Sequence, residues 1–295
     1  MENKFKDLSP LKKKEAYFGW KLISPAVILI GLFILYPVIY NIYLSFFEVS
    51  ISPNQPNKFV GFANYTRILS DATFWNSFGT TLLFVLITVA GSILVGLGVA
   101  LLMNKKFPGR SIVRALILFP YVAPVISTVF AWQYVLMPVN GPLTLLLSNL
   151  GIMDAGKDLI NDPNNALIVV SIYSIWKNFP FIYLMILSRL QSIPEDYYEA
   201  ADIDGANGWK KFRHITLPEL YYVLGSLVLL RGIWNFYKFE EVYLLSKEAK
   251  TLPIYLYERA FVGIPELGVA AAISTVLFIV MMVLITIYVR RVLKW

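Results

Sequence analysis

The sequence predicts an all-α membrane protein, and three observations support this fold class. Of the 295 residues, 57% are apolar and only 15% are charged, and the mean hydropathy is +0.62. Six apolar runs reach the length of about 20 residues that a helix needs to cross roughly 30 Å of hydrocarbon. Basic residues gather at the ends of these runs. Because every backbone amide must find a partner within lipid, the runs indicate helices rather than a sheet.

The six predicted spans form a single transmembrane domain that covers residues 1–295. They share the length and low charge of lipid-crossing helices, and they cover residues 22–47, 78–103, 113–136, 166–190, 217–239 and 268–289. The first apolar run follows a basic stretch but is longer than the core of a signal peptide. It is therefore expected to be a retained first span.

The Lys and Arg residues of the connecting segments predict the orientation. With a cytoplasmic N-terminus, seventeen of them fall on the inner side and seven on the outer side, although the last outer loop alone carries four of the seven. This excess predicts that both termini are cytoplasmic. It also accounts for the net charge of +7 without a nucleic-acid partner, because nucleic-acid binders gather basic residues on one face.

Small residues and prolines make some spans irregular. In the second span, Ser92, Gly96 and Ala100 repeat every four positions, which lets another helix approach closely. Each proline removes a backbone donor, so kinks or broken helices are expected wherever a span contains one. The prolines in question are Pro37, Pro120, Pro124 and Pro180.

The sequence lacks the residues that several kinds of chemistry require. There is no cysteine, and the single histidine, His214, cannot form a metal-binding cluster with others. A glycine-rich phosphate loop ending in Gly-Lys-Ser/Thr is absent, so ATP must be handled by another polypeptide. Away from their ends, the predicted spans contain Lys177 and Arg231 but no carboxylate. This argues against an ion-coupled carrier and against an intramembrane hydrolase, both of which need further charged or nucleophilic groups.

The segment between the fourth and fifth spans, residues 192–218, is the most informative. Ser192 and Glu195 stand at capping-box spacing with Pro194 in the first turn, which predicts the start of a helix. Gly205 can adopt a left-handed conformation, which suits the end of that helix and a bend into a second one. The result would be a rigid cytoplasmic projection. An alternative is an interfacial helix on lipid headgroups, which the basic residues Lys210, Lys211 and Arg213 would suit.

This segment resembles the cytoplasmic signature of the permease family of ABC importers. The signature runs Glu-Ala-Ala, three residues, Gly, nine residues, Ile, one residue and Leu-Pro, and it is matched by Glu199, Ala200, Ala201, Gly205, Ile215, Leu217 and Pro218. In that family the projection couples to a cleft of the ATP-hydrolysing subunit. The resemblance implies an ATPase interface formed by Glu199, Ala200, Ala201, Asp204, Gly205 and Gly208.

Further motifs resemble the maltose-type branch of this family, and the resemblance covers nearly the whole chain. A Tyr-Pro in the first span that leads to Ser-Phe is matched by Tyr36, Pro37, Ser45 and Phe46, and a Gly-Asn-Tyr-like element in the first outer loop by Gly61, Phe62, Asn64 and Tyr65. An Arg, a Trp and a Phe of the fifth span are matched by Arg231, Trp234 and Phe239. A Leu-Pro before an aromatic stretch is matched by Leu252, Pro253, Tyr255 and Tyr257. One departure follows Leu245, where relatives often carry a glycine-rich turn and this chain has SKEAK.

Related permeases line their translocation path with polar and aromatic residues of the fourth and fifth spans. The resemblance implies a substrate path formed by Lys177, Asn178, Tyr183, Arg231, Asn235 and Lys238. Aromatic residues such as Trp176 and Trp234 could stack on sugar faces. The cations could instead be structural, tied to a backbone carbonyl or to a partner subunit. They would also suit an acidic glycan, although relatives for neutral sugars often carry one or two of them.

The resemblance implies one half of an ATP-driven importer of a sugar or oligosaccharide in a bacterial inner membrane, with no catalytic residue or cofactor of its own. The implied partners are a second homologous permease, a dimer of ATP-binding subunits that carries ATP and Mg, an extracytoplasmic solute-binding protein and the lipid bilayer. The alternatives are an ion-coupled secondary carrier, a membrane-bound enzyme, and a permease for a non-sugar solute such as a phosphorylated polyol.

Overall fold

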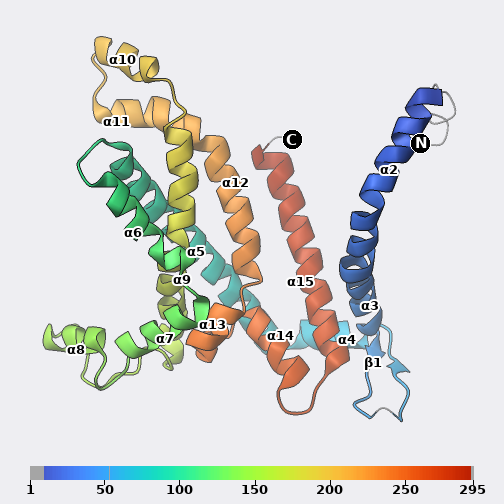
Figure 1. The fold of residues 1–295 in the computed structure, drawn as a ribbon. Coiled ribbons are helices and arrows are strands. Elements are labelled where there is room, and N and C mark those ends of the chain that lie inside the picture. The colour runs from blue at the N-terminus through green and yellow to red at the C-terminus, as the bar shows by residue number, and fades with distance from the viewer. Residues whose placement is uncertain (1–9, 53, 294–295) are drawn as a thin grey trace. The chain divides into compact units, whose positions relative to one another are not determined.

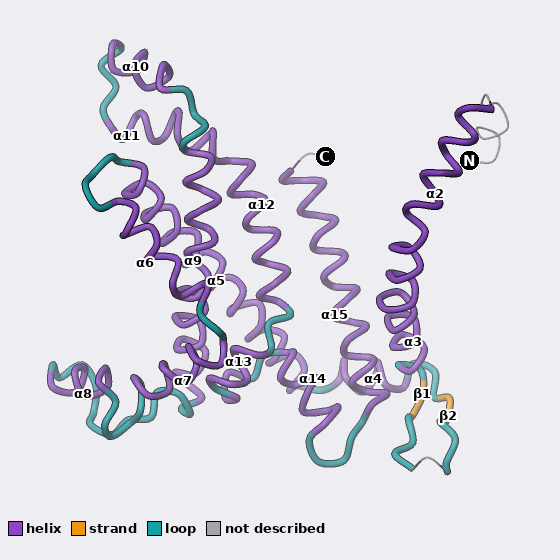
Figure 2. Tube along the Cα trace, viewed as in Figure 1, coloured by secondary structure: helices purple, strands orange, loops and turns teal. Residues whose placement is uncertain are grey.

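The computed structural model describes residues 10–52 and 54–293, and these residues are mostly helical (Figures 1 and 2). The expected all-α character is therefore confirmed at this level. Three of the basic residues that were counted on the inner side lie outside the described residues, namely Lys4, Lys6 and Lys294. The chain divides into two compact units, Met1–Ser70 with Arg259–Phe278, and Asp71–Glu258 with Ile279–Trp295.

The first unit contains the N-terminal helices and a short two-stranded ribbon. Its own elements are α2 (Pro10–Ile30), the π-helical turn η1 (Gly31–Leu35), α3 (Tyr36–Leu44), β1 (Phe47–Glu48), β2 (Lys58–Phe59) and α4 (Ala63–Ser70). The strands pair antiparallel, with Phe47 opposite Phe59. The end of α14 (Leu252–Phe261) and the start of α15 (Leu267–Tyr288) complete this unit.

The residues after α3 are held by the loop motif that was matched to the maltose-type branch. Asn64 of α4 donates from Nδ2 to the carbonyl oxygens of Ser45 and Phe47, at 2.9 and 3.0 Å. The hydroxyl of Tyr65 shares a 2.6 Å hydrogen bond with that of Ser45. Backbone carbonyls that are removed from water need a hydrogen-bond partner, and Asn64 supplies it to two residues that follow α3. The motif thus has a structural role in this unit.

The second unit contains the remaining helices. They are α5 (Ala72–Asn104), α6 (Arg110–Val122), α7 (Val125–Val135), α8 (Pro142–Asn149), α9 (Pro163–Leu190), α10 (Glu195–Ile203), α11 (Gly208–Lys211), η2 (Phe212–Thr216), α12 (Leu217–Phe236), α13 (Glu240–Leu245), η3 (Lys247–Ala249) and η4 (Val289–Leu293), with parts of α14 and α15. Asp71 and Asp162 cap α5 and α9 by accepting from the backbone N–H groups of Thr73 and Asn164.

Helices α5 and α9 pack closely through the small residues that the sequence analysis singled out. Ser92, Gly96 and Ala100 are all buried. A Cβ atom on Gly96 would lie 2.7 Å from Cγ2 of Ile182 on α9, inside van der Waals contact. The predicted close approach of another helix is therefore confirmed, and α9 is the helix that approaches. Leu220 and Leu227 of α12 belong to the same apolar core.

Replacing Gly96 with leucine is expected to destabilise the α5–α9 pair by about 2 kcal/mol, because overpacking a close contact typically costs 1–3 kcal/mol. The matched control is Gly98→Leu on the same helix, because Gly98 is exposed and has no atom within 4 Å of an added Cβ. Thermal unfolding of the purified assembly in detergent would measure both. Equal melting temperatures for the two variants would contradict this packing.

Four helical segments are long and apolar enough to cross a membrane: Lys14–Leu44, Ala72–Asn104, Pro163–Leu190 and Leu267–Arg291. They correspond to the first, second, fourth and sixth predicted spans. The third predicted span is not one straight helix, because α6 and α7 are bent by 94° at a break between them. Counting this pair as one span raises the total to five among the described residues.

The fifth predicted span forms α12, but it does not meet the same criterion of length and apolarity. The polar residues Glu219, Arg231 and Asn235 lie within this helix of 20 residues. Such residues are expensive in lipid and stand where they contact protein or a polar path. Length and composition alone therefore do not give the predicted count of six.

The prolines have unequal effects. Pro124 follows Ala123, whose backbone is extended, and the break lies at this pair as expected. In contrast, α9 continues through Pro180 without interruption. Near Pro37 the helical stretch also continues, with η1 directly before α3. Helix α6 likewise continues through Pro120. Of these four prolines, only Pro124 therefore stands at a break between two helices.

Candidate functional site

The segment that follows α9 contains two short helices, and Gly205 forms the turn between them (Figure 1). Gly205 has a φ of +71°, the left-handed conformation expected from the sequence. The N–H of Gly205 donates to the carbonyl of Asp202, and the N–H of Ala206 donates to that of Ala201. These two bonds form a Schellman cap, which satisfies the last carbonyls of α10. Asn207 then caps α11 by accepting from the N–H of Lys210 at 2.9 Å.

The predicted capping box at the start of α10 is wrong. The helix begins at Glu195, its N-cap is Pro194, and no side chain caps it. Ser192 instead donates from its hydroxyl to the carbonyl of Arg189 at 2.8 Å. The physical reason is proximity, because the last carbonyls of α9 lack a helical partner four residues on, lie directly before Ser192 and compete for its hydroxyl.

Side chains tie the segment to itself and to the neighbouring long helices. Lys211 pairs with Asp202 at 2.7 Å, which links the two short helices. The hydroxyls of Tyr198 and Thr216 lie 3.0 Å apart and share a hydrogen bond. At the base, Arg189 of α9 forms an ion pair with Glu219 of α12. The segment is therefore braced at both ends.

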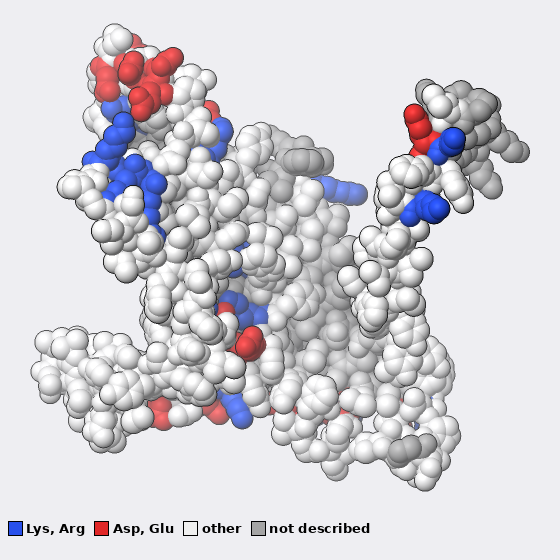
Figure 3. All heavy atoms as spheres, viewed as in Figure 1, with Lys and Arg blue, Asp and Glu red and all other residues white. Residues whose placement is uncertain are grey.

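The residues expected to contact an ATPase lie on the outside of this segment. Glu199, Ala200, Asp204, Gly205 and Gly208 are exposed, and Ala201 is half-buried. Ile203 has 88% of its surface exposed. Figure 3 shows acidic side chains gathered over α10 and basic side chains over the adjacent α11. A single exposed apolar side chain is common on protein surfaces, so the expected contact with an ATPase depends on the signature rather than on Ile203 alone.

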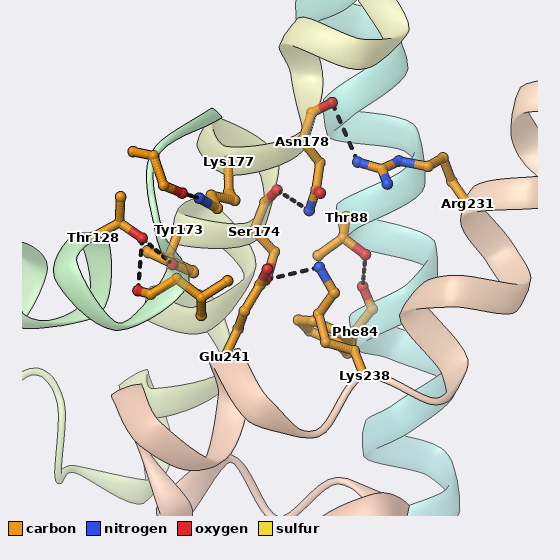
Figure 4. A network of polar contacts seen from close by, with 12 residues as sticks. Phe84, Thr88, Thr128, Tyr173, Ser174, Lys177, Asn178, Arg231, Lys238 and Glu241 are labelled. Atoms are coloured by element: carbon orange, nitrogen blue, oxygen red, sulfur yellow. Dashed lines mark hydrogen bonds and ion pairs between the residues drawn. The ribbon is translucent and has the colours of Figure 1, made fainter. Parts of the chain in front are cut away.

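Residues predicted to form the substrate path lie mostly in a buried polar network between α9, α12 and neighbouring helices (Figure 4). Lys177 is only 4% exposed, and its Nζ donates to the carbonyl of Ala123 at the break between α6 and α7. Asn178 donates from Nδ2 to the carbonyl of Ser174 at 2.6 Å. The alternative in which a cation is bound to a backbone carbonyl therefore describes the observed contact of Lys177.

Arg231 of α12 contacts α9 within this network. It is 4% exposed, and its Nη2 donates to the carbonyl of Asn178 at 3.3 Å. Its guanidinium carbon lies 5.4 Å from the ring centre of Phe181 and 5.3 Å from that of Trp234. Both distances suit cation–π attraction, which is stronger where water is excluded. The buried Nε of Arg231 has no hydrogen-bond partner.

Glu241 is a residue of this buried network that the sequence reasoning missed, because it lies two residues beyond the predicted fifth span. Lys238 donates to its Oε2 at 2.8 Å, and each of the two side chains is 12% exposed. The signal that could have revealed this pair was the spacing of Lys238 and Glu241 three residues apart. The network therefore contains an anion after all, at the edge of the membrane helices.

Two predicted residues retain free hydrogen-bonding capacity. Asn235 is 1% exposed and its Oδ1 has no partner. Tyr183 is fully buried and its hydroxyl also has no partner, but its ring packs in the apolar core with Ile182 and Leu187. A hydroxyl-rich ligand could satisfy such groups, since buried polar atoms normally have a partner. Among the described residues, no group of three or more His, Asp and Glu side chains could hold a metal ion.

The long apolar helices, the buried polar network and the braced segment after α9 define an α-helical integral membrane protein. Residues 92–294 match the family of binding-protein-dependent transport system inner membrane components, and the chain belongs to this family. Its members are the membrane components of such systems. The protein is therefore a multi-pass membrane transport subunit rather than an enzyme.

The chain is similar to permeases along nearly its whole length. It is 40% identical to the inner membrane ABC transporter permease protein YcjO of Escherichia coli (strain K12), over 93% of this chain and 94% of the relative. It is 33% identical to the trehalose/maltose transport system permease protein MalF of Thermococcus litoralis, over 96% of each chain.

A solved structure shows the same fold. The chain resembles a subunit in the crystal structure of a bacterial ABC transporter involved in the import of the acidic polysaccharide alginate. The TM-score is 0.80 and the sequence identity is 20%, with 97% of this chain and 99% of the other covered. The fold is thus that of an ABC importer permease.

Proposed function

We propose that this protein forms half of the translocation path of an ATP-driven importer for a sugar or oligosaccharide. The observation that carries the proposal is the complete Glu199–Pro218 signature on an exposed, braced segment, in a chain of the binding-protein-dependent family. The sugar class is supported by the relative that is named a trehalose/maltose permease. A neutral and an acidic sugar both remain compatible with the path residues.

In this proposal the whole chain works as one permease domain with six spans, the fifth being α12 and the third being the bent pair α6 and α7. Both termini are cytoplasmic, and so is the segment of residues 192–218, called the coupling segment from here on. The basic residues at the inner helix ends support this orientation. Arg231 and Asn235 are acceptable in a span because they are buried within the protein, and Glu219 lies in the first turn of α12, where it pairs with Arg189.

The coupling segment is the proposed contact with the ATP-binding subunits, which carry ATP and Mg. Glu199, Ala200, Ala201, Asp204, Gly205 and Gly208 form the interface. We expect exposed Ile203 to enter an apolar depression of that partner, because burying an isoleucine side chain contributes about 1.5–3 kcal/mol. ATP binding closes the ATPase pair, and the rigid segment passes that movement to α9 and α12. Transport then follows from the changed relative stability of two conformations.

The substrate path is proposed to run beside the buried polar network. The proposed path residues are Lys177, Asn178, Tyr183, Arg231, Asn235 and Lys238. The free Nε of Arg231 and Oδ1 of Asn235 supply one donor and one acceptor for sugar hydroxyls. Trp234, which lies against Arg231, offers an aromatic face. A second homologous permease completes the path, and a solute-binding protein delivers the sugar from outside.

The complete assembly, copurified from cells and reconstituted in vesicles, is expected to take up the sugar carried by its binding protein only when ATP is present inside. Mass spectrometry of the copurified ligand identifies that sugar and its charge. Uptake driven by a proton or sodium gradient without ATP would instead indicate an ion-coupled carrier. A phosphorylated polyol as the copurified ligand would retain the importer but replace the substrate class.

A further inference from the structure

The break between α6 and α7, residues 123–124, leaves a backbone carbonyl without a helical partner. Pro124 disfavours a helical conformation for Ala123, whose ψ is 141°. The carbonyl of Ala123 therefore lies outside the helical hydrogen-bond pattern. An unsatisfied carbonyl in a membrane interior costs several kcal/mol. Lys177 of α9 donates to this carbonyl.

A second contact holds the other side of the break. The hydroxyl of Thr128, in the first turn of α7, donates to the carbonyl of Val125 at 2.8 Å and shares a 2.8 Å hydrogen bond with the hydroxyl of Tyr173 on α9. Trp132 of α7 packs edge-on against the ring of Tyr173, with ring centres 5.5 Å apart. The start of α7 is thus attached to α9 by polar and aromatic contacts.

The other arm of the bend contacts the same face of α9. Tyr121 of α6 packs on Phe181, with ring centres 5.7 Å apart. Tyr173, Lys177 and Phe181 are spaced four residues apart, so they lie in a row along one face of the helix. One row of side chains therefore contacts α7, the break and α6 in succession (Figure 4 shows Tyr173 and Lys177).

We propose that Lys177 is a positioning residue, which holds the 94° bend between α6 and α7 on α9, rather than a ligand of the transported sugar. Because α9 leads into the coupling segment, the bend moves with α9 when that segment is displaced. The inference rests on the proposed transport function and deepens it. It assigns to one of the six path residues a role in coupling the ATPase to the membrane helices.

The test uses the complete importer in lipid nanodiscs, with spin labels on either side of the bend. This chain has no cysteine, so Leu116→Cys on α6 and Tyr134→Cys on α7, both exposed, give a single labelled pair when the partner subunits are used in cysteine-free form. In Lys177→Met the distance distribution is expected to broaden by about twofold. The stimulation of ATP hydrolysis by the loaded binding protein should fall by about fivefold or more.

Companion variants separate positioning from folding and from sugar binding. Lys177→Arg retains a donor and should restore most of the stimulation, and Tyr173→Phe should give a smaller change in the same direction as Lys177→Met. The matched control is Lys157→Met, at an exposed lysine outside the network, which should match the wild type. An unchanged distance distribution in Lys177→Met overturns the proposal. So does a loss of sugar affinity with an unchanged distribution. If the wild type shows no ATP-driven uptake, the proposed function fails, whereas the distance measurement still decides the role of Lys177.

Discussion

Replacing Gly205 with valine is expected to reduce ATP-driven uptake at least about tenfold while the subunits still assemble. Gly205 adopts a φ of +71° between α10 and α11. A left-handed conformation costs an ordinary residue about 1–2 kcal/mol, and a β-branched residue is a clear outlier there. The valine variant should therefore distort the turn and misalign the coupling segment. A loss of about 1.4 kcal/mol of coupling corresponds to a factor of ten. Uptake into vesicles measures the effect, and copurification of the ATPase subunit checks assembly.

Two further substitutions make this result specific. Gly205→Asn should retain most activity, because asparagine tolerates the left-handed region. Gly156→Val is the matched control, since Gly156 has a φ of +77° and open space around it but lies outside the coupling segment. If Gly205→Val transports like the wild type with the assembly intact, the coupling role of this segment is refuted.

Replacing Glu241 with glutamine is expected to destabilise the protein by about 3 kcal/mol. The change leaves Lys238 almost buried and without its 2.8 Å ionic partner, and removing one member of a buried pair typically costs 3–5 kcal/mol. The lower end of that range applies because each side chain retains 12% exposure. The negative charge of Glu241 also attracts Lys177 and Arg231. Its loss therefore leaves Lys177, Arg231 and Lys238 without an anion in this network. Thermal unfolding of the assembly in detergent would measure the change.

The double variant Lys238→Met with Glu241→Gln provides the control for this pair. It removes both charges, so it should be more stable than either single variant, as expected when an isolated buried charge dominates the loss. Strictly additive losses would show that the two side chains act independently, which would contradict a stabilising ion pair at this site.

Apolar run length predicted four spans well, because lipid imposes the same requirement on every crossing helix. The starts of α5 and α9 lie a few residues before the predicted spans, since Asp71 and Asp162 cap the helices outside the apolar runs. The 94° bend at Pro124 and the unbroken course of α9 through Pro180 could not be separated in advance. Both prolines remove a donor, and what differs is the conformation adopted by the preceding residue and the packing around each carbonyl.

For the candidate site, the spacing of the signature located the turn at Gly205 correctly, because a left-handed glycine is a local property. The capping box failed because the end of α9 competes for Ser192, which is a matter of neighbouring structure. Glu241 was missed because the limits of the fifth span were set by apolar residues, and these ended before Glu241. Only the structure shows that Glu241 pairs with Lys238 near the end of that span.

Composition and spacing by themselves determined that this protein is helical and membrane-embedded, and they located its exposed signature. These properties depend on residues close together in the chain and on the hydrocarbon that surrounds them. The tertiary structure decided which carbonyls Lys177 and Arg231 satisfy, since their partners, Ala123 and Asn178, lie 54 and 53 residues away. A buried cation is stable only where folding places an acceptor within hydrogen-bond distance, and this placement depends on how α6, α9 and α12 pack.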